Sequence, residues 1–198
     1  DFISVRERTR TFEQVEAFSG GVFTMLGAGE PREVRGTNVS DGLLGLLGLP
    51  VTLGRTLLPG ENQPGRNGVA VLDHGFWQRQ FGGDRNVLGR TVTIAGAPVE
   101  IVGVLAPGAR LLDDADIYTP LEYDDTFSAA TAKDRRGEFL VVIGRARPGL
   151  TLATIDDDLS RIGSELQAAF RETNDTLTFN ARSLDEVMLG DVRTPLLV

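Results

Sequence analysis

The sequence predicts an α+β fold, and three segments carry this prediction. Residues 151–169 begin with a capping threonine and continue with apolar side chains at spacings of three and four, as in an amphipathic helix. Residues 139–146 are rich in apolar and β-branched side chains and precede a Pro-Gly turn, which is typical of a strand. Residues 91–104 predict a β-hairpin of two short strands, 91–94 and 99–104, joined by an Ala-Gly-Ala-Pro turn.

The first fifty residues predict two helices and two strands. Residues 4–18 predict a helix, because Val5, Phe12, Val15 and Phe18 can share one face. Residues 20–29 predict a strand with loose, glycine-rich ends, and residues 33–40 a second strand with alternating side chains. A short helix follows from the cap at Ser40 or Asp41 to Leu47, where Gly48 ends it.

The middle of the chain starts with a loop at residues 55–68, which is rich in Gly, Pro and Asn. A short buried strand at 69–72 comes next, and Asp73 caps a helix that Gly82-Gly83-Asp84 ends. Residues 105–137 are irregular and acidic, apart from an apolar piece at 117–121. Further on, residues 176–182 alternate and predict a final strand.

The order of these elements predicts two lobes. The apolar stripe of the helix at 151–169 consists of Leu152, Ile155, Leu159, Ile162, Leu166 and Ala169. Together, residues 30–48 and 139–183 suggest an open-faced α+β sandwich. Residues 69–105, with their own helix and hairpin, suggest an inserted lobe.

Composition and charge exclude several functions. The chain of 198 residues has a net charge of −8, a single lysine at Lys133 and no basic stripe with interleaved aromatic residues, so nucleic-acid binding is not expected. There is no cysteine, which excludes disulfides, thiolate metal sites and thiol nucleophiles. No segment contains the roughly 18 consecutive apolar residues of a membrane helix.

Candidates for catalysis are few. His74 is the only histidine, and a serine-type triad would need it as the general base. Its neighbour Asp73 does not face it on a helix, and no G-x-S-x-G elbow is present, so a histidine at a helix N-terminus is the simpler interpretation. The 28 acidic residues provide no basis for choosing a glycosidase pair.

The sequence evidence for ligand sites is similarly weak. A calcium site could use Asp113, Asp114 and Asp116, or Asp124 and Asp125, but the D-x-[DN]-x-[DN]-G spacing is absent and a solvated acidic loop is the default. No phosphate-binding motif surrounds Lys133 or Gly27-Ala28-Gly29. Three aromatic side chains could form a platform for a sugar or peptide, although core packing is favoured: Phe76, Trp77 and Phe81. No catalytic, cofactor-binding or metal-binding residue is therefore assigned.

Four segments together resemble a known family: residues 38–55, 69–90, 91–109 and 139–152. The most specific part is the run Trp-Gln-Arg-Gln-Phe-Gly-Gly-Asp-Arg-Asn-Val-Leu-Gly-Arg at 77–90, followed by Ile-Val-Gly-Val-Leu-Ala-Pro at 101–107. This series resembles the periplasmic core domain of MacB-like ABC transporter permeases (MacB/FtsX-type). Residues 6–12 are similar to the family's helix after its first membrane span.

The resemblance implies a porter-like α+β lobe and a smaller inserted lobe. On this sequence the first is discontinuous, at 1–54 and 106–198, and the second is 55–105, with a hinge near 55–68 and 105–137. It implies an extracytoplasmic (periplasmic) location at the bacterial inner membrane, with membrane helices outside this sequence and both termini on one side of the domain. The implied partners are a cytoplasmic ATPase subunit, a periplasmic adaptor, and a second permease copy or half. The implied function is to relay ATP hydrolysis into movement that exports a substrate.

Two other functions remain open at this point. A ligand-binding or sensing domain would line a concave site with the aromatic side chains near Trp77 or with the acidic segment 113–125. A carboxylate hydrolase would need His74 and the acids of that segment for its activity.

Overall fold

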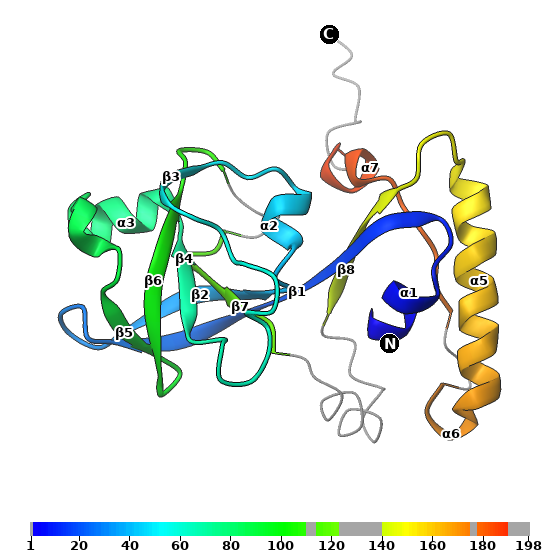
Figure 1. Cartoon of the computed structure of the whole chain (residues 1–198), viewed down its shortest axis with the longest axis horizontal. Coiled ribbons are helices and arrows are strands. Elements are labelled where there is room, and N and C mark those ends of the chain that lie inside the picture. Colours follow the sequence, from blue (N-terminus) through cyan, green and yellow to red (C-terminus); the bar gives the residue numbers. More distant parts are fainter. Residues whose placement is uncertain (1, 110–113, 123–139, 175–177, 190–198) are drawn as a thin grey trace, which may run out of the picture. The chain divides into compact units, whose positions relative to one another are not determined.

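The computed structural model describes residues 2–109, 114–122, 140–174 and 178–189, and it confirms the α+β class (Figure 1). The chain divides into two compact units. Unit 1 comprises residues 1–15, 133–137 and 144–198, and unit 2 comprises residues 16–132 and 138–143. No helix within the described residues is both long enough and apolar enough to cross a membrane.

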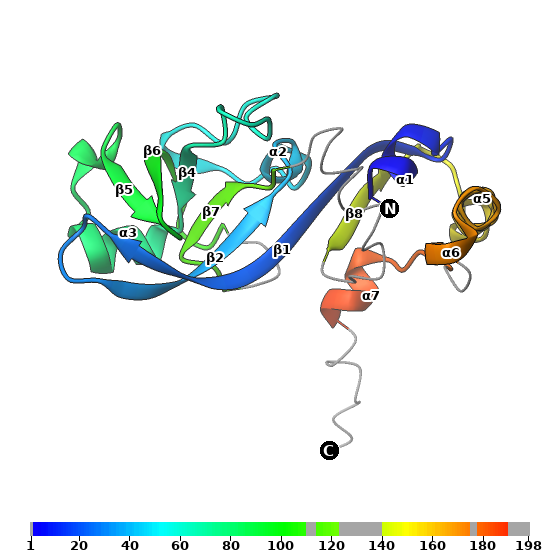
Figure 2. The same cartoon turned by 90° about the horizontal axis from the view of Figure 1, so that it is seen from below.

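Six strands of unit 2 form a closed ring, hereafter the strand ring. Its order is β2-β7-β4-β6-β5-β1, and the pairing of β1 with β2 closes it (Figure 2). β2 runs parallel to β7, β4 runs parallel to β6, and the other pairs are antiparallel. The strands are β1 (Phe12–Leu26), β2 (Arg32–Val39), β4 (Val69–Leu72), β5 (Thr91–Ile94), β6 (Ala97–Leu105) and β7 (Ile117–Pro120); β3 (Val51–Gly54) pairs with β6. Closure removes the free edges that an open sheet would expose.

The predicted helix at 4–18 is wrong beyond its first turns. Helix α1 (Phe2–Arg8) ends early, and residues 12–18 belong to β1. The Thr9 hydroxyl accepts hydrogen bonds from the backbone N–H groups of Thr11 and Phe12, both at 3.3 Å, which turns the chain out of the helix. The apolar spacing of Val15 and Phe18 fits a helix equally well, so periodicity alone did not separate the two structures.

Glycine permits close packing where β1 meets β2. Gly21 faces Gly36 across the two strands, and the ring of Phe23 covers the glycine pair. A Cβ atom on Gly36 would lie within 2.3 Å of that ring. The Phe23 side chain also packs against the larger core cluster of unit 2, which includes Trp77 and Ile101.

In unit 2 the predicted cap of α3 and the predicted hairpin turn are confirmed, whereas the helix cap predicted at Ser40 or Asp41 is wrong, because the helix at Leu43–Leu46 has Gly42 at its N-cap and no side-chain cap hydrogen bond. The carboxylate of Asp73 caps α3 (His74–Phe81) by accepting a hydrogen bond from the Phe76 N–H at 2.9 Å, and Gly82 ends the helix in the left-handed conformation. The 69–72 strand and the 91–104 hairpin also form, and the hairpin turns at Ala95 and Gly96, both with positive φ. Two short elements complete this unit, α2 (Leu43–Leu46) and the 3₁₀ turn Arg85–Val87.

Unit 1 is built around α5 (Leu152–Ala169), capped by Thr151 as predicted. Of the predicted apolar stripe, Ile155, Leu159, Ile162 and Leu166 are buried, whereas Leu152 and Ala169 at its ends are exposed. This unit also contains the helices α6 (Arg171–Asn174) and α7 (Leu184–Leu189). The predicted strand at 176–182 does not form over its described residues, 178–182.

A buried carboxylate connects α5 to the start of the chain. Asp158, with 7% of its side chain exposed, accepts hydrogen bonds from the Arg10 N–H at 2.7 Å, from the Thr9 and Thr11 hydroxyls at 3.1 Å, and from Arg161 at 2.6 Å. Burial by itself raises the pKa of Asp158, but these hydrogen bonds outweigh it and lower the pKa to about 2. The same Arg161 lowers the pKa of Glu165, which also pairs with Arg8 at 3.4 Å.

The division between the units differs from the lobes expected at 1–54 with 106–198 and at 55–105. Residues 16–54 belong with 55–105 because β1 and β2 are strands of the ring. The two unit boundaries that fall on described residues lie within β1, at 15/16, and within β8 (Val141–Ala146), at 143/144. The expected hinge at 55–68 therefore lies inside unit 2 and not between the two units. Most of the second expected hinge, 105–137, lies outside the described residues, as does the C-terminal end.

The loop at 55–68 is also fixed by specific contacts. Arg55 forms a two-point ion pair with Glu61, at 2.7 and 3.0 Å, which raises the pKa of Arg55. The Gly60 N–H donates to Asp41 at 2.6 Å, and the Arg55 backbone lies against Gly103, where a Cβ atom would be 1.9 Å from the Arg55 carbonyl oxygen.

Candidate functional site

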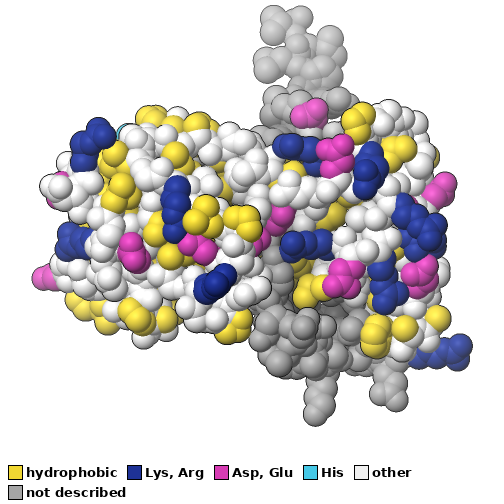
Figure 3. Space-filling model, in the orientation of Figure 1, with side chains coloured by type: hydrophobic (Ala, Val, Ile, Leu, Met, Phe, Trp, Pro, Cys, Tyr) yellow, Lys and Arg dark blue, Asp and Glu magenta, His cyan; other side chains and the backbone are white. Residues whose placement is uncertain are grey.

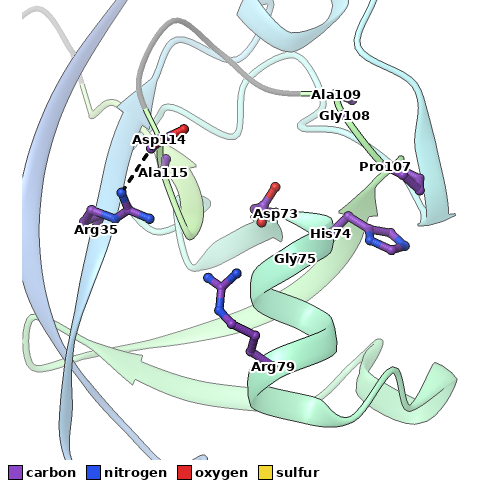
Figure 4. Close-up of a pocket in the computed structure, with 10 residues that line it drawn as sticks. All are labelled: Arg35, Asp73, His74, Gly75, Arg79, Pro107, Gly108, Ala109, Asp114 and Ala115. Carbon is purple, nitrogen blue, oxygen red and sulfur yellow. Dashed lines mark ion pairs between the residues drawn. The ribbon is translucent and has the colours of Figure 1, made fainter.

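A pocket opens in unit 2 where two parallel strands end. Residues 73–75 directly follow β4, residues 107–109 begin two positions after the end of β6, and both segments line a cavity of about 390 Å³ (Figure 4). The carboxyl ends of parallel strands are a common place for ligand sites in mixed folds. Arg35 from β2, Arg79 from α3 and the pair Asp114 and Ala115 before β7 complete the lining.

Asp116 holds the two arginines of the pocket in place. Its carboxylate is 12% exposed, and it accepts hydrogen bonds from Arg79 at 2.9 Å and from the Arg35 backbone N–H at 3.0 Å. The Nε atom of Arg35 lies 3.6 Å from the same carboxylate. The backbone of Asp116 bonds to Arg35 and Asp73, so one residue joins β2, β7 and the start of α3.

The described residues do not place a nucleophile and an orienting acid around His74, so the structure does not support the catalytic hypothesis for this residue. The carboxylate of Asp73 is engaged in capping α3, and the His74 ring stacks edge-on against Trp77, with centroids 5.4 Å apart. In Figure 4 the His74 ring points toward Pro107, away from Arg35 and Asp114. Among the described residues, no hydrogen bond links this ring to a nucleophile.

The aromatic platform is contradicted. Phe76 and Trp77 are buried in the larger core cluster, and Phe81 is partly buried against it. The Trp77 indole N–H donates to the Asp84 carbonyl at 2.9 Å, so the polar edge of its ring is also used within unit 2. These side chains are core residues, as the competing interpretation held.

The acidic cluster is described only in part. Asp114 and Asp116 pair with arginines, whereas Asp113, Asp124 and Asp125 lie outside the described residues. No group of three or more metal-ligating side chains occurs in the part of the chain that the structure describes. The face shown in Figure 3 mixes acidic, basic and apolar side chains.

Comparison with known proteins assigns the family. Residues 1–162 match the family described as the MacB-like periplasmic core domain. The chain belongs to this family. It is thus an extracytoplasmic domain of a MacB-like ABC transporter permease, as the sequence resemblance predicted. No match was found among curated proteins.

Three solved structures share the fold. The periplasmic region of MacB from Actinobacillus actinomycetemcomitans is 15% identical, with a TM-score of 0.65 over 98% of this chain and 83% of that one. The extracellular domain of the noncanonical ABC-type transporter YknZ from Gram-positive bacteria is 18% identical, with a TM-score of 0.60 over 87% and 83%. A domain assigned to a permease protein from Porphyromonas gingivalis is 18% identical, with a TM-score of 0.63 over 94% and 83%.

Sequence reasoning singled out Asp73, His74 and the acidic cluster among the residues of this pocket, but it did not identify the two arginines or bring these residues together. Arg35 and Asp116 are 81 positions apart and meet because β2 pairs in parallel with β7, with Gly36 opposite Ile117. No local motif encodes that register. For the arginines, the available signal was the acidic pair Asp114 and Asp116, whose partners the sequence did not identify.

Proposed function

We propose that this domain relays movement from the membrane helices of its permease to the outside of the cell, in a cycle that exports a substrate. A cognate cytoplasmic ATPase supplies the energy, and the membrane helices connect it to this domain. The membership of residues 1–162 in the MacB-like family is the observation that carries the proposal. A periplasmic adaptor and a second permease copy or half are the expected partners.

The way the two units are connected supports this function. The two boundaries that fall on described residues lie within strands, at Val15/Glu16 in β1 and at Ile143/Gly144 in β8. Unit 1 also holds the described residues nearest to both ends of the chain, 2–15 and 178–189. In the proposed cycle, unit 1 takes up the motion of the membrane helices and the two strands carry it to unit 2.

The test is a distance measurement in the intact permease with its ATPase. The chain has no cysteine, so spin labels can be placed at introduced cysteines, S160C in unit 1 and R85C in unit 2, both exposed positions. We expect the distance between the labels to change when a non-hydrolysable ATP analogue is added. The control pair R85C and E33C lies within unit 2 and should keep its distance. An unchanged distance in the first pair, with ATP hydrolysis intact, would overturn the proposal.

The alternative function, a ligand-binding or sensing domain, has one observation in its favour. The acidic segment does contribute to a concave site, through Asp114 in the pocket of unit 2. That pocket is independent of the mechanical relay, and both functions can exist in one domain.

A further inference from the structure

Helix α5 holds two segments of unit 1 that belong to opposite ends of the described chain. The first segment, residues 8–11, connects α1 to β1, and the second segment, residues 178–182, leads to α7. Each segment is bonded to α5 through a backbone N–H group, so the bond fixes the path of the chain itself. Hydrogen bonds to a charged acceptor are roughly twice as strong as those between neutral groups.

The first segment is held by Asp158. Its carboxylate accepts hydrogen bonds from the Arg10 N–H at 2.7 Å and from the hydroxyls of Thr9 and Thr11, both at 3.1 Å. The Thr9 N–H donates in turn to the carbonyl of Val5 in α1, at 3.0 Å, and Thr11 directly precedes β1. One carboxylate therefore binds the end of α1, the turn that follows it and the residue before β1.

The second segment is held by Asp156, two positions earlier on the same helix. Its carboxylate accepts a hydrogen bond from the Ala181 N–H at 2.7 Å. The Val187 N–H of α7 bonds to the carbonyl of Ser183, so α7 starts close behind the bond to Ala181. Because an α-helix has about 3.6 residues per turn, side chains two positions apart leave it in different directions and can hold two segments at once. Both segments lie beside α5 in Figure 1.

These bonds provide a constraint that the apolar face of α5 does not. The buried side chains of that face make non-directional contacts, and packed helices can slide past one another by small shear movements. A hydrogen bond between a helix carboxylate and a backbone N–H is directional and is broken by such a slide. The bonds to Arg10 and Ala181 therefore fix both segments along the axis of α5.

We propose that α5 is a coupling helix, through which α1 and α7 move as one body, and that Asp156 and Asp158 are its positioning residues. The inference rests on the proposed function, in which unit 1 takes up the motion of the membrane helices. If either segment slid along α5, part of that motion would be lost within unit 1 before it reached β1. The two carboxylates prevent this loss, whereas Asp157 between them is exposed to solvent.

The first test measures distances within unit 1 of the intact permease with its ATPase. Spin labels are placed at introduced cysteines in two pairs, E7C in α1 with A168C in α5, and A168C with D185C in α7; all three positions are exposed. We expect both distances to stay constant when a non-hydrolysable ATP analogue is added. A change in either distance would overturn the proposal, because that helix would be moving relative to α5.

Variants of the aspartate run test the two bonds separately. Asp156→Ala removes the acceptor for the Ala181 N–H, so we expect a broader distance distribution for the pair A168C and D185C, and hydrogen exchange about tenfold faster at Ala181. Asp157→Ala is the matched control and should leave both unchanged. Asp158→Asn should broaden the distribution of the pair E7C and A168C in the same way. Asp156→Ala loses one hydrogen bond of a half-buried side chain, so it tests the proposal even if Asp158→Asn folds poorly.

A second measurement separates coupling from stability. The pair A168C and R85C reports motion between the two units, and Asp156→Ala should reduce its response to the ATP analogue while ATP hydrolysis and thermal melting stay close to those of the parent protein. Asp157→Ala should keep the response. A full response in Asp156→Ala, or equal distance distributions in Asp156→Ala and Asp157→Ala, would overturn the coupling role. No response in the parent protein would instead contradict the proposed relay, and the two pairs within unit 1 would still decide the role of α5.

Discussion

The carboxylate of Asp158 accepts a hydrogen bond of 2.7 Å from the backbone N–H of Arg10, a residue 148 positions earlier in the chain. This bond joins the middle of α5 to the connection between α1 and β1. The two threonine hydroxyls and the Arg161 guanidinium complete the shell of this one carboxylate. Unit 1 therefore has a polar centre as well as the apolar face of α5.

Asp158→Asn should destabilise the protein. The asparagine keeps the size of the side chain but loses the charge that receives these hydrogen bonds, so we expect the free energy of unfolding to fall by about 2 kcal/mol. Urea denaturation followed by circular dichroism measures the change. Asp157→Asn, at the exposed neighbouring position, is the matched control and should change the free energy of unfolding by less than about 0.5 kcal/mol. Equal effects of the two substitutions would contradict this role of Asp158.

The stabilisation by Asp158 should depend on pH in a defined interval. Its pKa in the folded protein is about 2, below the ordinary value of 3.8, so the folded state favours the ionised form. The contribution is therefore complete above about pH 4 and is lost as the pH falls toward about 2. The difference in unfolding free energy between the wild type and Asp158→Asn should shrink over that interval. A difference that stays constant down to pH 2 would rule out this assignment.

Gly36→Ala should destabilise the strand ring. The new methyl group would lie 2.3 Å from the Phe23 ring, which must move, and overpacking of this kind costs about 1–3 kcal/mol. Thermal melting should show the loss, and Phe23→Leu in the same chain should recover part of it by making room. The control is Gly45→Ala in α2, where a Cβ atom meets nothing within 4 Å and alanine favours the helix. If Gly36→Ala melts like the wild type, the described packing is wrong.

Glu61→Gln should loosen the loop that follows β3. The substitution removes the charge that pairs with Arg55 and weakens the acceptor for the Leu58 N–H, a bond of 2.7 Å. We expect the Leu58 amide to exchange with solvent faster, and global stability to fall by no more than about 1 kcal/mol because Arg55 is partly exposed. Hydrogen exchange monitored by NMR measures both. Unchanged exchange at Leu58 would show that other contacts hold this loop.

Elements set by neighbouring residues could be predicted from the sequence, and elements set by distant pairing could not. Asp73 and Thr151 are caps whose chemistry depends on the next three residues, so both helix starts are confirmed. Residues 12–18 have a spacing that fits a helix or a strand. They form the first part of β1, whose later residues 18–25 pair with residues 32–39, and this distant pairing favours the strand. For the same reason β3 and the parallel pairing of β2 with β7 were not predicted.

The same limit applies to the candidate site. The sequence identified Asp114 and Asp116 as chemically interesting but associated them with calcium, since their arginine partners are far away in the chain. Phe76, Trp77 and Phe81 were correctly favoured as core residues because their spacing fits one helix face. Family membership, in contrast, was visible in the sequence because it depends on a run of consecutive turn and core residues.

The closed strand ring also constrains the order in which the domain can assemble during synthesis. β2 and β4 both pair with β7, whose last residue is Pro120. Until that residue has left the ribosome, both strands have one edge with unpaired backbone N–H and C=O groups. A nascent chain halted before this point would therefore be prone to aggregate, although more than four fifths of the residues of unit 2 would already be present. During that interval, a chaperone that covers exposed strand edges, or fast translation through residues 117–120, would do most to prevent misfolding.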